Sequence, residues 1–195
     1  PRFVNQGEST TRTLGNPDAT ILEINSKTGL YPLYATYSVY RAKLGDRKES
    51  DLLPEELINI WDEAVKQVYV LCQSSMAADI TKRTLIGYRE VETNIKHDNQ
   101  LLKDLETSIE NTAQNIKRGR YWKKEVKEMK FDAVVGNPPY QEETAKKQSL
   151  TNGQARRKSI FHLFQLAADE ISSGVTSLIY PGARWIHRSG KGMTD

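Results

Sequence analysis

Short, continuous apolar runs alternate along the chain with segments whose apolar residues recur every three or four positions. The first pattern is typical of buried parallel strands, and the second is typical of helices with one buried face. The predicted strands are 19–24, 68–73, 92–99, 131–137 and 174–181, of which 92–99 is the weakest. The predicted helices are 30–44, 53–67, 74–85, two within 100–130 that part near Gly119, and 158–171. This alternation predicts an α/β fold with a mostly parallel sheet and helices on both faces.

The composition changes this picture little. Of the 195 residues, 37% are hydrophobic and 27% are charged, which are ordinary globular values and exclude a wholly disordered chain. The length suits a single domain, which we place at 1–195. The net charge of +3 permits a nucleic-acid partner but does not require one.

Several features that the sequence lacks exclude whole classes of protein. A single cysteine, Cys72, excludes an internal disulfide and fits a reducing compartment. No apolar run has the length of a membrane span and no signal-peptide pattern is present, so we expect a cytoplasmic protein with no membrane partner. The histidines His97, His162 and His187 lack metal-ligand spacing, so we expect no metal site. The chain starts at Pro1 without a methionine, so we expect a fragment of a longer polypeptide.

The stretch FDAVVGNPPYQ, residues 131–141, ends a predicted strand in a stiff polar turn. Ligands of open parallel sheets bind at the carboxyl ends of strands, where Asn137 lies. Each proline fixes its own φ and restricts the residue before it, so the turn offers carbonyl acceptors and few N–H donors. Asn137 adds a side-chain acceptor, and Tyr140 adds a flat apolar face. This arrangement suits a planar ligand with an NH₂ group, such as adenine; the alternative is a purely structural turn.

GNPPY after a strand resembles motif IV of the amino-group DNA methyltransferases, and the asparagine form is typical of the adenine-N6 enzymes. The resemblance implies a Rossmann-like methyltransferase fold, S-adenosylmethionine as cofactor, and double-stranded DNA with a flipped adenine as partner. It also implies that the asparagine and the first proline accept the hydrogens of the amine while the tyrosine stacks on the base. The implied catalytic residues are Asn137, Pro138, Pro139 and Tyr140.

The stretch LEINSKTG, residues 22–29, resembles the glycine-rich loop that holds the cofactor in this family. Glu23 takes the acidic place that faces the methionine amino group, and Gly29 takes the last glycine, where the backbone approaches the ligand. Asn25 lies between them and is assigned to the same site. Ile24 and Lys27 replace the family's proline and first glycine, so we expect weak cofactor binding by residues 1–195. Without the resemblance, this stretch is a strand end followed by a turn.

Three further residues match cofactor positions less closely. Cys72 falls where the second strand usually carries an acid for the ribose hydroxyls, although we prefer to interpret it as a packed strand residue. Asp98 matches the acid near the adenine of the cofactor, with a solvated turn aspartate as the alternative. Thr10, within FVNQGESTT, approximately matches a motif that precedes the first strand, with an N-terminal tail as the alternative.

A basic stretch, QEETAKKQSLTNGQARRKS at 141–159, follows the motif at once. Its cations are predicted to hold DNA phosphates near the flipped base, and the alternative is a solvated loop. These cations are Lys146, Lys147, Arg156, Arg157 and Lys158. A second basic stretch, GRYWKK at 119–124, also carries aromatic residues, but the sequence does not place it on the fold.

The resemblance covers nearly the whole chain and is strongest to the methylase part of large restriction–modification enzymes, whose polypeptide can also carry a nuclease or target-recognition region. The predicted function is therefore methyl transfer from S-adenosylmethionine to the N6 amine of adenine in DNA. We expect residues 1–195 to lack the last strands and the target-recognition region and to be poorly active alone. The alternatives are a non-catalytic nucleic-acid-binding module on this scaffold and methylation of protein glutamine.

Overall fold

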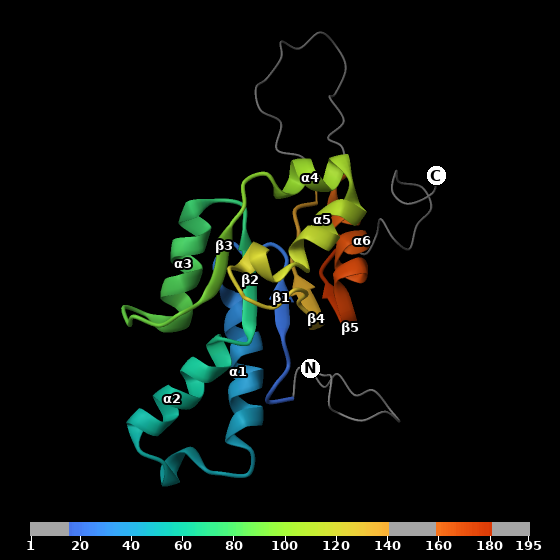
Figure 1. The fold of residues 1–195 in the computed structure, drawn as a ribbon. Helices are drawn as coiled ribbons and strands as arrows, with labels where there is room; N and C mark the ends of the chain where they lie inside the picture. Colours follow the sequence, from blue (N-terminus) through green and yellow to red (C-terminus); the bar gives the residue numbers. More distant parts are fainter. Residues whose placement is uncertain (1–15, 141–158, 181–195) are drawn as a thin grey trace.

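Five strands form one sheet in which every neighbouring pair is parallel (Figure 1). The computed structural model describes residues 16–140 and 159–180. The strand order is β3-β2-β1-β4-β5. The strands are β1 (Ile21–Glu23), β2 (Val68–Cys72), β3 (Asn94–His97), β4 (Phe131–Gly136) and β5 (Ser172–Leu178). The predicted α/β, Rossmann-like fold is confirmed, and the sheet is parallel throughout the described residues rather than mostly parallel.

Helices cover both faces of this sheet (Figure 1). They are α1 (Leu30–Leu44), α2 (Pro54–Val65), α3 (Ser75–Ile86), α4 (Leu101–Thr107), α5 (Ile109–Ile116) and α6 (Phe161–Ile171), with the short 3-10 helices η2 (Glu49–Asp51) and η3 (Gly119–Trp122). One hydrophobic core joins α1 and α3 to one face. A second core joins α4, α5, η3 and α6 to the other face.

Neighbouring side chains on a strand enter opposite cores, as the two-residue period of a strand requires. Ile21 packs in the core with α1, and Leu22 packs in the core with α4, α5 and α6; both are fully buried. Burial on both faces explains the apolar runs of the inner strands β1 and β2, whereas the edge strands β3 and β5 are only partly buried. The pairing of Glu23 with Val135 brings the carboxyl ends of β1 and β4 side by side.

The segment 100–130 differs from the prediction of two helices parted near Gly119. α4 and α5 meet at Ser108 instead, because this residue has an extended backbone (φ −161°, ψ 110°). Its side chain accepts a hydrogen bond from Asn111 N at 3.2 Å and so caps α5. Serine is a typical helix-start residue, and the sequence analysis missed this signal. After α5, the chain forms only η3 and an irregular return to β4.

Gly119 holds the return between α5 and β4 together. Its N–H donates to Lys127 O at 3.3 Å, and its carbonyl accepts from Lys124 N at 2.9 Å. A Cβ atom on residue 119 would lie 1.7 Å from the backbone carbonyl oxygen of Val126. We expect Gly119→Ala to lower the free energy of unfolding by about 1–3 kcal/mol, because the backbone must shift to admit the methyl group. Urea denaturation measures this, and an unchanged midpoint would contradict the close backbone contact.

Candidate active site

The loop after β1 and the turn after β4 meet at the carboxyl edge of the sheet. The Asn25 side chain donates from Nδ2 to the backbone carbonyl of Asn137 at 3.4 Å. Tyr31, in the first turn of α1, lies near both segments. Burial raises its pKa, and the charges of the neighbouring Glu23 and Tyr140 raise it further. The structure thus brings together four predicted site residues, which are Glu23, Asn25, Asn137 and Tyr140. Tyr31 is a neighbour that was not predicted from the sequence.

The turn at 137–140 combines a packed base with an exposed ring. Pro138 is buried, Asn137 and Pro139 are half-buried, and Tyr140 is 37% exposed. The Tyr140 hydroxyl donates to Asn137 Oδ1 at 3.0 Å, which holds the side-chain amide in one orientation. The carbonyl oxygen has a second lone pair that this bond leaves available. At its far end, the turn is tied to the start of α6, because Ile160 N donates to Tyr140 O at 3.3 Å.

Glu23 is a buried acid at the end of β1 with an unused oxygen atom. The residue is 1% exposed, and Oε2 has no hydrogen-bond partner within the described part of the chain. Burial raises the pKa of Glu23 to about 8, against the smaller opposite effect of a hydrogen bond from the Ser26 side chain. A cation beside the carboxylate would favour the charged form and lower this pKa. A buried acid of this kind at a sheet edge is a candidate for binding a cationic ligand group.

Gly29 closes the loop between β1 and α1. Its φ is 78°, and a Cβ atom there would lie 3.0 Å from both Thr81 Cα and Thr84 Cβ. Its N–H donates to Ser26 Oγ at 3.2 Å, and Ser26 Oγ lies 3.1 Å from Thr81 Oγ1. We expected this glycine to admit a ligand, but its close neighbours belong to α3. The left-handed backbone and the packing against α3 therefore explain the glycine, and the exposed Lys27 shares the loop.

The end of β2 carries a buried thiol followed by a buried amide. Cys72 is fully buried, its Sγ lies 3.9 Å from Thr81 Oγ1, and burial raises its pKa to about 11. These are the surroundings of a packed strand residue, so they give no support to Cys72 as a ribose contact. Gln73 follows directly, and its Nε2 is buried with no hydrogen-bond partner among the residues described. Gln73 was not among the residues predicted from the sequence, although a polar residue directly after a strand was a usable signal.

The side chain of Asp98, directly after β3, accepts two hydrogen bonds. Its Oδ1 accepts from Gln100 N at 3.1 Å, and its Oδ2 accepts from the Tyr121 hydroxyl at 2.5 Å. Lys96 Nζ donates to Tyr121 O at 2.9 Å and lies 3.3 Å from the centre of the Tyr121 ring. Burial, and then the bond to Asp98, raise the pKa of Tyr121, so its hydroxyl remains a donor at neutral pH. Asp98 is thus an ordered acid rather than a solvated turn aspartate.

The remaining predicted site residues lie outside the described ranges 16–140 and 159–180. They are Thr10, Lys146, Lys147, Arg156, Arg157 and Lys158, and their roles stay predictions. Within the described ranges, no group of three or more His, Cys, Asp and Glu side chains is arranged to hold a metal ion. No helix of these ranges has the length and apolar character that crossing a membrane requires.

The family model described as Eco57I restriction-modification methylase matches residues 66–195, two thirds of the chain. The matched part includes the turn at 137–140 and every strand except β1. Comparison with curated proteins and with solved structures yields no significant match.

Proposed function

The chain belongs to the Eco57I restriction-modification methylase family, and on that premise we propose that it methylates the N6 amine of adenine in DNA with S-adenosylmethionine as donor. A methyltransferase role in restriction–modification follows from the family itself. One structural arrangement supports the choice of the adenine N6 amine and of S-adenosylmethionine. A turn rich in amine acceptors and a buried, unpaired acid leave neighbouring strands at the same edge, joined through Asn25 and Asn137.

The residues at this edge fit S-adenosylmethionine, which supplies a methyl group bound to a positively charged sulfur. In this proposal, Glu23 binds the ammonium group of the cofactor, and Asn25 and Gly29 shape the loop around its methionine part. Gln73 and Asp98 face the ribose and the adenine. Two buried polar atoms support the assignment, because Glu23 Oε2 lacks a donor and Gln73 Nε2 lacks an acceptor in the described structure. A cation and a ribose oxygen would satisfy them.

Each residue of the turn at 137–140 has its own role at the target base. Asn137 Oδ1 and the Pro138 carbonyl accept the two hydrogens of the adenine amine, which makes its nitrogen a better nucleophile. The hydroxyl of Tyr140 keeps Asn137 Oδ1 in place, and its exposed ring stacks on the base. A base in a duplex reaches such a pocket only after it is flipped out of the stack. The reaction then depends mainly on positioning in line with the donor.

Double-stranded DNA is the partner, and the cations of the 141–159 stretch contact its phosphates beside the target base. Residues 1–195 form one methyltransferase domain, and a nuclease or target-recognition region shares the polypeptide. The cytoplasm is the expected location.

Replacing Tyr121 by phenylalanine tests the cofactor part through a residue that does not touch the ligand. The change removes the donor to Asp98 Oδ2 and leaves the ring. We expect S-adenosylmethionine affinity to fall about 5- to 20-fold, less than the full worth of a hydrogen bond to a charged group, because this bond acts on the ligand only through Asp98. Calorimetric titration measures this. Tyr88→Phe, at an 89% exposed tyrosine, is the matched control. Equal affinities of both variants and the unmutated protein would contradict the role of Asp98.

Titration of the full-length protein with S-adenosylmethionine tests the donor directly. We expect one site per chain, competed by S-adenosylhomocysteine and weakened about 100-fold or more in Glu23→Gln. For residues 1–195 alone we expect binding weaker than low micromolar, because Lys27 and Cys72 occupy positions where the family has a glycine and an acid. The absence of any binding by the full-length protein at millimolar cofactor would contradict the proposal.

A further inference from the structure

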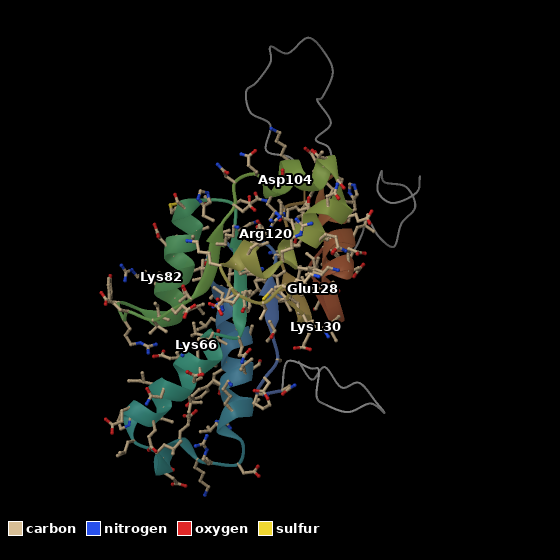
Figure 2. All side chains as sticks on the ribbon, in the orientation of Figure 1. Lys66, Lys82, Asp104, Arg120, Glu128 and Lys130 are labelled. Carbon is tan, nitrogen blue, oxygen red and sulfur yellow. The ribbon has the colours of Figure 1, made fainter. Side chains whose placement is uncertain are left out.

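The segment 117–130, between α5 and β4, concentrates the positive charge of the molecule. It contains seven lysines and arginines and two glutamates, a net charge of +5. The whole chain has a net charge of only +3, so all its other residues together sum to −2. Figure 2 shows Arg120, Glu128 and Lys130 on this segment and Lys82 on α3, away from it. None of the lysines and arginines of the segment 117–130 has a part in the proposed active site.

The segment borders a cavity of about 600 Å³ that is lined by Lys117, Arg118, Arg120, Lys124 and Lys127, with Glu125 and Glu128. A second cavity of about 380 Å³ adjoins it and shares Gln114 and Arg118 with it. The second cavity is lined mainly by hydroxyl and amide side chains of α4 and α5 and of Ser108 between them. We call the two together the basic groove. Val126 is the one apolar side chain among its lining residues.

Three of the lining cations are unpaired. Lys117 and Lys124 form ion pairs with Glu170 and Glu92. Arg118, Arg120 and Lys127 form no ion pair and no side-chain hydrogen bond within the described residues. Glu125 and Glu128 are likewise unpaired there. The groove therefore presents free charged groups of both signs, with the cations in excess.

The backbone that carries these cations is rigid. Gly119 packs against the Val126 carbonyl, and Met129 N donates to Lys117 O at 2.6 Å. The indole of Trp122 is buried and donates to Ile116 O at 2.8 Å. The backbone of the free cations is therefore held at defined positions instead of on a loose loop, which reduces the backbone entropy lost when they bind a ligand.

We propose that the basic groove binds the phosphodiester backbone of DNA that flanks the target adenine. Lysine, arginine, hydroxyl and amide side chains are the groups that contact phosphate and sugar in protein–DNA complexes. A surface with a single apolar side chain lacks the apolar anchors that a protein partner needs. The second cavity lies beside α4, which starts three residues after Asp98 at the carboxyl edge of the sheet. The choice of DNA among polyanions rests on the proposed function.

The test compares two triple variants of the full-length protein by the salt dependence of duplex DNA binding. Arg118→Ala, Arg120→Ala and Lys127→Ala together remove the free cations of the groove. Each lost phosphate contact lowers the slope of log affinity against log salt by about 0.9, so we expect a decrease of up to about 2.7 and an affinity at least tenfold lower. The control variant combines Lys43→Ala, Lys48→Ala and Lys82→Ala, on or beside α1, η2 and α3, and keeps the original slope.

Two further measurements separate the possible outcomes. Glu125→Gln with Glu128→Gln removes the repulsion of phosphates and should raise DNA affinity, and an unchanged S-adenosylmethionine affinity in all variants shows that they are folded. If the unmutated protein binds DNA and the groove variant has the same slope, the groove proposal is wrong and the proposed function stands. If the unmutated protein neither binds nor methylates DNA, the proposed function fails and the groove proposal fails with it.

Discussion

Replacing Asn137 by alanine in the full-length enzyme lowers methyl transfer to adenine by about 100- to 1000-fold, the usual cost of one preorganised hydrogen-bond partner in a transition state. The change removes the side-chain acceptor but keeps both prolines and the Tyr140 ring, so the amine loses one of its two polarising bonds. DNA affinity changes far less, because phosphate contacts supply most of it. Labelled methyl transfer to duplex DNA, with DNA affinity measured in parallel, gives both numbers. A variant with the original rate would leave the turn with a purely structural role.

Two tyrosine variants serve as controls for the asparagine result. Tyr140→Phe keeps the stacking ring but removes the hydroxyl that donates to Asn137 Oδ1, so it should slow the transfer modestly. Tyr140→Ala also removes the ring, and capture of the flipped base should weaken by roughly 1–3 kcal/mol. If Tyr140→Phe is as damaging as Tyr140→Ala, the ring does not act as a stacking platform.

Replacing Glu23 by glutamine weakens S-adenosylmethionine binding by about 100-fold or more, because the ammonium group of the cofactor loses a buried charged partner. The same change raises the stability of the free protein at pH 8, since it removes a buried carboxyl group that is about half ionised there and has no cation beside it. A glutamate with only a structural role would not combine weaker cofactor binding with higher stability on replacement. Calorimetric titration and urea denaturation at pH 8 measure them, and a destabilised variant with normal affinity would contradict this role.

The pH dependence of stability follows from the same group. The pKa of Glu23 is about 8 in the folded protein and 4.5 as a reference, so between these values the folded state binds more protons than the unfolded state. Stability therefore falls as pH rises from about 4.5 to about 8, by at most about 5 kcal/mol from this residue, and then levels off. Glu23→Gln lacks this fall. Cofactor affinity should rise over the same interval in the unmutated protein, because binding requires the ionised form.

Much of the fold could be predicted because the sheet is buried on both faces. Strands such as 68–73 and 131–137 then form short continuous apolar runs, and helices between them keep a separate period. The NPPY turn could be placed as well, since two prolines directly after a strand have few conformations available. Ser108 was missed because a serine within a charged, helical pattern has the same local sequence whether it caps a helix or faces solvent.

The supporting residues of the site depend on contacts across the fold, which local patterns do not contain. Tyr121 reaches Asp98 from 23 positions away, and nothing in GRYWKK indicates that its tyrosine faces β3. The sequence indicates that position 29 requires a glycine, but it does not show whether the close neighbour of that glycine is α3 or a ligand. The burial of Glu23, which makes the acid chemically unusual, likewise becomes visible only when α1 covers the strand end.

Identification of the methylated atom is the decisive test of adenine-N6 methylation by this protein. The full-length protein is incubated with duplex DNA and labelled S-adenosylmethionine, the DNA is digested to nucleosides, and the label is assigned by chromatography and mass spectrometry. We expect N6-methyldeoxyadenosine as the labelled product, and its loss in Asn137→Ala. Label on cytosine or on the protein, or no label on DNA from an enzyme that binds the cofactor, would contradict it.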